Sequence, residues 1–204
     1  MRKFFISISI LFLWAFGHFT SRFSPFGRRP SKSDKNKFKV SDHFNYKRGV
    51  FENQTIGLIR KMKRKNLKKN MIKAWFDAGE DRVPLETLPE VKPNIEDFLK
   101  PSDSLKTIWF GHSTLLLNLD GKIILIDPVF SKSASPVNWI LVRFQNAILE
   151  LEELPEIDYI VISHDHYDHL DMETIKFFLD KKRTKFITPL GVGSHLTGWG
   201  IEKN

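Results

Sequence analysis

The sequence predicts a mixed α/β fold for the second half of this chain. Four short apolar runs are typical of strands, at residues 105–110, 113–119, 122–127 and 158–163. The dipeptide Asp120-Gly121 separates two of these runs and is a strong signal for a two-residue hairpin. After the last run, apolar residues at helical spacing predict a helix over 171–180, with Asp171 as its N-cap. Strands followed by a helix indicate a domain that contains both kinds of element.

The composition supports a packed core and restricts the kinds of metal site. The chain has 204 residues, of which 41% are hydrophobic and 18 are Phe, but it has no Cys. This apolar content argues against a disordered chain. Without cysteine there is no disulfide framework and no thiolate site, so a metal must be held by His and carboxylate side chains.

Positive charge is concentrated in the first third of the chain. Residues 1–73 contain 19 Lys and Arg against three acids, whereas residues 74–204 contain 13 against 21. The overall pI of about 9.6 therefore belongs to a basic N-terminal arm and not to the predicted domain. Because no nucleic-acid-binding motif accompanies the charge, we expect no nucleic acid as a partner.

The first 21 residues have the pattern of a membrane-targeting segment. A basic Met-Arg-Lys start precedes an apolar run over 4–19, which at about 1.5 Å per residue is shorter than the roughly 30 Å hydrocarbon core. A cleaved signal peptide and a short membrane anchor both fit, and the basic residues that follow favour the anchor. A buried helix of a soluble domain fits less well. We expect membrane association through this segment, on a side that the sequence leaves open.

Two further segments connect this run to the domain. Residues 22–54 are predicted to be a basic linker, and residues 55–103 to contain a basic amphipathic helix followed by a Pro-containing lead-in. The basic helix can either pack on the domain or lie on anionic lipid. The predicted domain itself covers 104–204.

A dense cluster of imidazole and carboxylate groups follows the last predicted strand. Its six consecutive residues are His164, Asp165, His166, Tyr167, Asp168 and His169. Neutral imidazole and carboxylate suit zinc, manganese or iron, and two such ions can activate a water molecule for hydrolysis without a protein nucleophile. The position between a buried strand and a helix predicts a metal site in this loop.

These residues give the chain a family resemblance. The matching segments lie at residues 109–114, 126–130, 133–136, 154–158, 164–169 and 188–191. Together they resemble the metallo-β-lactamase superfamily, in the branch that contains N-acylphosphatidylethanolamine phospholipase D. The resemblance implies the α/β class and an αββα four-layer sandwich with a dinuclear zinc centre, a metal-activated water and a phosphodiester substrate such as an N-acylated phospholipid.

The resemblance also implies roles for individual residues. His164 and His166 would bind the first metal, and Asp168 and His169 the second, with Asp168 also the candidate catalytic residue. Asp127 would be an outer-shell or structural residue. Two histidines and a tyrosine outside this ligand set leave alternatives open. His112 is either a structural histidine or an outer-shell or substrate residue, His195 is structural rather than a further ligand, and Tyr167 shapes the loop.

The ligand set implied by the family is incomplete after His169. The family needs a further His, a bridging Asp and a late His, whereas only His195 follows. We therefore expect 104–204 to be the N-terminal half of the domain, apparently truncated, and a chain that ends at residue 204 to bind metal weakly with little turnover. Three alternatives remain to the phospholipid enzyme: a hydrolase of a soluble phosphoester or sugar lactone, a non-catalytic metal-binding membrane protein and, last, a nuclease.

Overall fold

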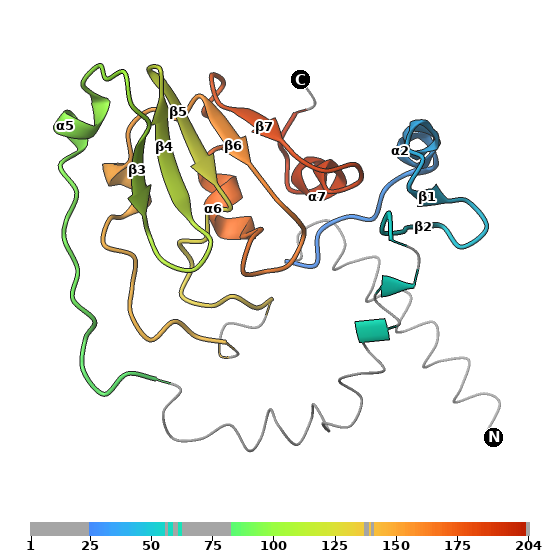
Figure 1. Ribbon diagram of the computed structural model, residues 1–204, viewed down its shortest axis with the longest axis horizontal. Coiled ribbons are helices and arrows are strands. Elements are labelled where there is room, and N and C mark those ends of the chain that lie inside the picture. Colours follow the sequence, from blue (N-terminus) through green and yellow to red (C-terminus); the bar gives the residue numbers. More distant parts are fainter. Residues whose placement is uncertain are drawn as a thin grey trace.

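The computed structural model describes residues 25–55, 57–58, 61–62, 83–136, 139 and 141–202. Five strands of the described chain form one mixed sheet in the order β3-β4-β5-β6-β7 (Figure 1). The strands are β3 (Lys106–Trp109), β4 (Leu115–Leu119), β5 (Lys122–Ile126), β6 (Tyr159–Val161) and β7 (Lys185–Ile187). The pairs β3–β4 and β4–β5 are antiparallel, whereas β5–β6 and β6–β7 are parallel. The predicted α/β class is confirmed.

The predicted hairpin joins β4 to β5. Asp120 and Gly121 have φ angles of 50° and 74°, the left-handed conformation that a two-residue hairpin turn of this kind requires at both central positions. The turn sets the register, in which Leu119 pairs with Lys122 and Leu116 with Leu125. Both of these inner leucines are fully buried, so the hairpin carries the centre of the core.

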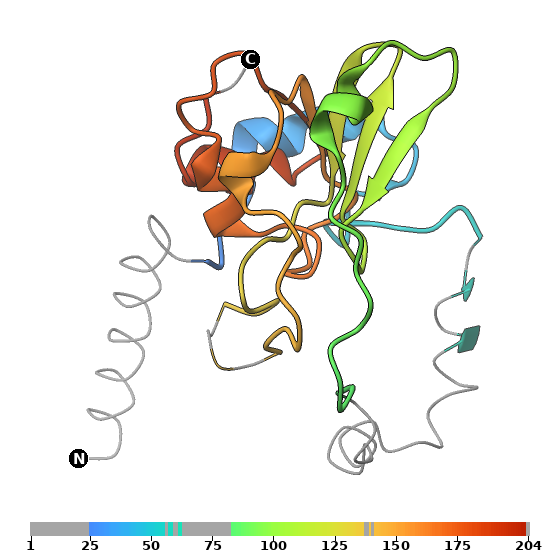
Figure 2. The same ribbon diagram turned by 90° about the vertical axis from the view of Figure 1, so that its left-hand side faces the viewer.

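The core lies between the sheet and two helices on one of its sides. These are α6 (Met172–Phe177) and α7 (Gly193–Gly198), which lie together on the same side of the sheet (Figure 2). Ile160 of β6 and Ile175 of α6 are both fully buried in this cluster, and Leu196 of α7 is almost so. At about 25 cal/mol per Å² of apolar surface removed from water, such burial is the main stabilising contribution of the domain.

The predicted N-cap of α6 is confirmed. The side chain of Asp171 accepts a hydrogen bond from the backbone N–H of Glu173 at 3.2 Å. The helix ends at Phe177, three residues before the predicted end, and the chain then turns toward β7. His195 lies in the second of these helices, α7.

The segment predicted as a basic linker contains ordered elements. They are α2 (Lys32–Lys37), the 3-10 helix η1 (Phe38–Val40), β1 (Phe44–Asn45) and β2 (Val50–Phe51). Phe38 is buried, and its ring centroid lies 5.3 Å from that of Phe44 and 5.2 Å from that of Phe51. These elements lie at the β7 side of the sheet, beyond α7 (Figure 1). The aromatic side chains spaced among the Lys and Ser residues therefore form a small cluster. The polar composition of the segment gave no indication of it.

The end of the predicted lead-in is also part of the domain. Helix α5 (Ile95–Leu99) lies at the β3 side of the sheet (Figure 1). Its Phe98 is buried in the core, and the Phe98 carbonyl accepts a hydrogen bond from Asn118 Nδ2 at 2.8 Å. A short 3-10 helix, η3 (Leu151–Glu153), precedes β6.

Two predicted segments lie outside the part that the structure describes. The apolar segment 1–21 is entirely outside it, and only residues 57–58 and 61–62 of the basic amphipathic helix after residue 55 fall within it. Among the described residues, no helix has the length and apolarity needed to cross a bilayer.

Candidate metal centre

The turn between β3 and β4 presents His112. Gly111 and His112 have φ angles of 94° and 46°, and the turn is closed by hydrogen bonds between the backbones of Phe110 and Thr114 and of Thr114 and Gly111. Left-handed backbone is uncommon for residues other than Gly and Asn, so the turn has to be fixed by its surroundings. The carbonyl of His112 accepts a hydrogen bond from Trp109 Nε1 at 3.1 Å. The imidazole is left 60% exposed, facing the predicted metal loop.

Thr114 fixes this turn to the end of β5. Its buried hydroxyl donates to the carbonyl of Asp127 at 2.8 Å and accepts from the backbone N–H of Val129 at 3.2 Å. The turn that carries His112 and the strand end that carries Asp127 are therefore held at one edge of the sheet.

Asp127 is a buried carboxylate that organises the metal loop. One oxygen accepts from the backbone N–H of Ser163 at 2.7 Å, and the other accepts from Ser163 Oγ at 2.6 Å. The second oxygen also lies 2.9 Å from Nδ1 of His169. With Nδ1 donating to this carboxylate, Nε2 of His169 is the ring nitrogen left to bind a metal. A carboxylate behind a histidine is the usual support for a histidine ligand, so the predicted outer-shell role of Asp127 agrees with its geometry.

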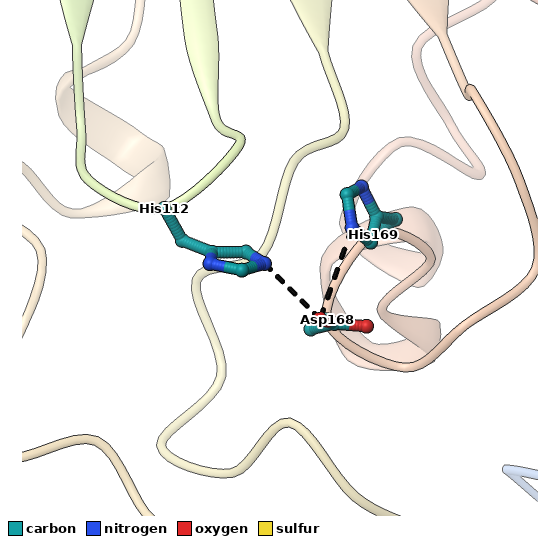
Figure 3. Close-up of side chains that lie close together, drawn as sticks. All are labelled: His112, Asp168 and His169. Atoms are coloured by element: carbon teal, nitrogen blue, oxygen red, sulfur yellow. Dashed lines mark hydrogen bonds and ion pairs between the residues drawn. The ribbon is translucent and has the colours of Figure 1, made fainter. Parts of the chain in front are cut away.

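Three donor groups converge at this edge. Nε2 of His112 lies 3.1 Å from Oδ2 of Asp168, and Nε2 of His169 lies 3.8 Å from the same oxygen (Figure 3). One donor atom from each residue lies within 4.8 Å of the others. Donor atoms around a tetrahedral ion with bonds of about 2.1 Å are about 3.4 Å apart. The three side chains therefore fit a divalent ion with small adjustments, and imidazole and carboxylate are suitable ligand types for it.

The two remaining predicted ligands lie beside this group. The ring centroid of His164 is 3.9 Å from that of His169 and 4.6 Å from that of His166. Their donor atoms are outside the three-residue group, whereas His112, predicted as a structural or outer-shell residue, is inside it. The structure thus brings together Asp168 and His169 as one site and adds His112 to them.

The surroundings of Asp168 favour its ionised form. Burial by itself would raise the pKa of this carboxyl, but a hydrogen bond from its own backbone N–H, the electrostatic interaction with His169 and the hydrogen bond with His112 outweigh it. The pKa of Asp168 is consequently below its ordinary value. Asp168 is therefore a carboxylate near neutral pH, the form that binds a metal.

The other two residues singled out in the sequence lie behind the loop. Burial lowers the pKa of His195, and the nearby Asp165 carboxylate only partly opposes this, so the imidazole is mainly neutral at pH 7. Its Nε2 lies 3.6 Å from Oδ2 of Asp165. The ring of Tyr167 meets that of Phe26 edge to face, with the centroids 6.4 Å apart. Both placements agree with the predicted structural and loop-shaping roles.

Sequence reasoning did not single out Ser163 as a site residue. Its hydroxyl contacts Asp127 at 2.6 Å and Nδ1 of His164 at 2.9 Å, so it connects the outer carboxylate with the start of the motif. The only available signal was its position, directly between a buried strand and the first histidine of the motif.

Comparison with known families agrees with this site. Residues 122–204 match the sequence model of the beta-lactamase superfamily domain. This part of the chain belongs to the beta-lactamase superfamily. It includes Asp127 and the whole 164–169 motif, whereas His112 lies before the matched residues.

Three curated relatives extend the comparison. An uncharacterized protein of Mycobacterium tuberculosis is 37% identical over 161 residues, which are 78% of this chain and 42% of the relative. N-acyl-phosphatidylethanolamine-hydrolyzing phospholipase D 1 of Caenorhabditis elegans is 36% identical over 125 residues, 60% of this chain and 35% of that protein. A UPF0173 metal-dependent hydrolase of Caldivirga maquilingensis is 42% identical over 62 residues, 30% of this chain and 22% of that protein. The chain thus spans about two fifths or less of the length of these relatives.

Proposed function

We propose that this protein is a metal-dependent hydrolase of the beta-lactamase superfamily. The observation that carries the proposal is the convergence of His112, Asp168 and His169, with the ring of His169 oriented by the buried Asp127. In this donor set one histidine is held by a buried carboxylate, and one side is open to solvent. This is the arrangement expected of a catalytic rather than a structural ion.

His112, Asp168 and His169 would hold the ion, with His164 and His166 as neighbouring donors for a second one. Zinc is the proposed metal, with manganese and iron as the alternatives that the same donors accept. When bound, such ions polarise a substrate oxygen and lower the pKa of water, which supplies the nucleophile of hydrolysis.

The chain's own residues prepare the site for this chemistry. Asp127 keeps the Nδ1 proton of His169 on the side away from the site, and the low pKa of Asp168 keeps its carboxylate charged. The side chain of His112 is 60% exposed and that of Asp168 is 40% exposed, so a substrate reaches this edge of the sheet from solvent. Asp127 thus orients a proposed ligand, and Asp168 supplies the negative charge of the site. Asp168 is also the proposed catalytic residue.

The proposed substrate is a phosphodiester, such as an N-acylated phospholipid. The likeness to the phospholipase of Caenorhabditis elegans supports this choice. The apolar segment 1–21 and the basic arm after it support a lipid surface as the partner and membrane association as the location. A soluble phosphoester or a lactone is the alternative substrate.

The substrate proposal is tested with the protein purified in detergent from its native source. We expect release of phosphatidic acid from an N-acylated phosphatidylethanolamine, loss of this activity after exhaustive chelation, and recovery with Zn²⁺ but not with Mg²⁺. Cleavage of bis(p-nitrophenyl) phosphate without cleavage of the phospholipid would favour the soluble substrate. Hydrolysis that persists without metal would reject the mechanism.

A matched pair of variants tests whether Asp168 contributes to catalysis. In Asp168→Asn the charged ligand is lost, and we expect activity to fall at least about 100-fold. Asp180→Asn removes an exposed carboxylate at the end of the turn after α6, and we expect it to keep wild-type activity. If both variants are as active as the wild type, Asp168 has no role in catalysis.

The location is tested separately by fractionation. We expect the full chain to sediment with membranes and to resist extraction by carbonate, and a chain without residues 1–21 to be released. Equal distribution of both proteins in the soluble fraction would contradict membrane association through this segment.

A further inference from the structure

Residues 25–30, here called the strap, lie against α7 and the loop before it. Gly198 of α7 faces the strap so closely that a Cβ there would lie 2.7 Å from Cβ of Arg28. Before α7, a Cβ on Gly191 would lie 3.1 Å from Cζ of Phe38 and in ordinary contact with Pro30, at 3.5 Å from its Cγ. Small residues on α7 and its preceding loop therefore accept the strap at backbone distance.

His195 is enclosed between the strap and its own helix. A Cβ on Gly27 would lie 1.9 Å from Nδ1 of His195 and 2.8 Å from Cγ, so only glycine permits this approach. At the C-cap of this helix, the Trp199 ring centroid lies 6.0 Å from that of His195. The His195 side chain is only 19% exposed as a result. Its ring position is therefore determined by Gly27 and α7 together.

Both the strap and α7 contact the metal loop, which consists of residues 164–169. Nε2 of His195 lies 3.6 Å from Oδ2 of Asp165, and the ring of Phe26 meets that of Tyr167 edge to face. Asp165 and Tyr167 are the two residues of the six-residue motif that are not proposed ligands. The strap and α7 therefore contact the loop at residues other than the proposed ligands.

We infer that Gly27 and His195 are positioning residues for the metal loop, acting through Asp165. The inference rests on the proposed metal site, but it concerns residues that do not touch the metal. Residues of this outer kind commonly alter metal affinity by about 10- to 100-fold when they are changed.

The chain offers a matched pair of glycines for the test. Gly27 and Gly49 have the same φ angle of 64°, but a Cβ on Gly49 would meet nothing within 4 Å. Gly27→Ala and Gly49→Ala therefore impose similar backbone strain, and only Gly27→Ala displaces the His195 ring. We expect Co²⁺ affinity, measured by chelator competition, to fall at least about tenfold in Gly27→Ala. In Gly49→Ala it stays within twofold of the wild type.

Hydrogen exchange in the metal-free protein gives a second readout. In Gly27→Ala we expect faster exchange of the amides of His169 and Leu170, which donate to the carbonyl of His166, and no change there in Gly49→Ala. A strap with a purely structural role would lower the melting temperature of Gly27→Ala while leaving both the exchange of these amides and the Co²⁺ affinity unchanged.

A double variant keeps the inference falsifiable if Gly27→Ala is poorly folded. In the His195→Ala background the added methyl group no longer meets a ring, so Gly27→Ala is expected to weaken Co²⁺ binding no further. His195→Gln, whose side-chain amide can still donate to Asp165, is expected to recover most of the affinity lost in His195→Ala. Additive effects of the two changes, or equal losses in the two His195 variants, would overturn the inference.

The two proposals fail in different ways. A wild-type protein that binds no Co²⁺ would overturn the metal site and, with it, this inference. Wild-type binding that survives Gly27→Ala unchanged would overturn the positioning role alone.

Discussion

Asp127 occupies the position on which the geometry of the candidate centre depends. It is 4% exposed, and its two oxygens accept from the backbone and hydroxyl of Ser163 and contact Nδ1 of His169. Its φ of 42° lies in the left-handed region, which Asp tolerates better than most residues. A single residue thus follows the end of β5, anchors the start of the metal loop and favours one tautomer of His169, a proposed ligand.

Asp127→Asn tests this role with little change of shape. One carboxylate oxygen becomes an NH₂ group facing Ser163 or His169, which are themselves donors, so we expect Co²⁺ affinity to fall about 10- to 100-fold. The measurement is chelator competition, with thermal unfolding recorded in parallel. Asp120→Asn is the control, because Asp120 also has a positive φ, of 50°, but lies exposed in the hairpin turn. Equal affinities in the two variants would contradict the support by Asp127.

His195 predicts a pH dependence of stability. Burial lowers its pKa in the folded protein, so on acidification the unfolded chain, with a pKa near about 6.5, takes up a proton before the folded chain does. The stability that the protein gains by burying a neutral His195 is therefore fully present above about pH 6.5. It is lost as the pH falls below this value. We expect the melting temperature of the wild type to drop more than that of His195→Gln between pH 7.5 and 5.5. Parallel curves for the two proteins would show that His195 does not carry this linkage.

Among the helices and strands, the sequence predicted those elements that a short run of residues specifies by its turn residues, its cap or its apolar spacing. The hairpin followed from Asp120-Gly121, and α6 followed from its cap at Asp171 and its apolar spacing. Strand β7 was not predicted, because three residues with one Phe and one Ile carry too little periodicity. It exists because β6 offers it an unpaired edge, with Ile160 in register with Phe186.

In the candidate site, too, the sequence predicted local features but not contacts between distant residues. Asp168 and His169 could be predicted because the motif is contiguous in sequence. The contact between Asp127 and His169 joins residues 42 positions apart, and that between His112 and Asp168 joins residues 56 apart. Such pairs depend on which strand ends the sheet brings to one edge, and no local pattern specifies them. The role of His112 was therefore left open by the sequence, and its position beside Asp168 is seen only in the fold.

The cap of α6 gives a prediction about this element. Asp171 is buried and accepts from Ser131, Thr174 and Glu173, which joins the helix to the segment after β5. Asp171→Ala leaves buried donors unpaired, and we expect unfolding in urea to show a loss of about 3 kcal/mol. Asn94→Ala removes the exposed cap of α5, which bonds only Asp97, and is expected to lose about 1 kcal/mol. Similar losses in both variants would mean that the additional contacts of Asp171 contribute little.

For the molecule as a whole, the strap and the aromatic cluster around Phe38 make part of the basic arm a component of the domain. We expect removal of residues 1–24 to leave the melting temperature within about 2 °C, because the contacts of Gly27 and Phe38 remain. Removal of residues 1–40 exposes α7 and is expected to lower it by at least about 5 °C. Differential scanning calorimetry of the two shortened chains measures this, and equal melting temperatures would show that the strap does not stabilise the domain.

The contact between Gly27 and His195 also bears on how the protein is made. These residues are 168 positions apart, so at about 5–20 residues per second the ribosome synthesises His195 roughly 10–30 s after Gly27. During that interval the strap has no α7 to pack against, and the side chain of Phe38, which is buried in the folded protein, is accessible to chaperones. The metal loop leaves the ribosome before the helix that supports it, so its final geometry is reached only after α7 has been synthesised.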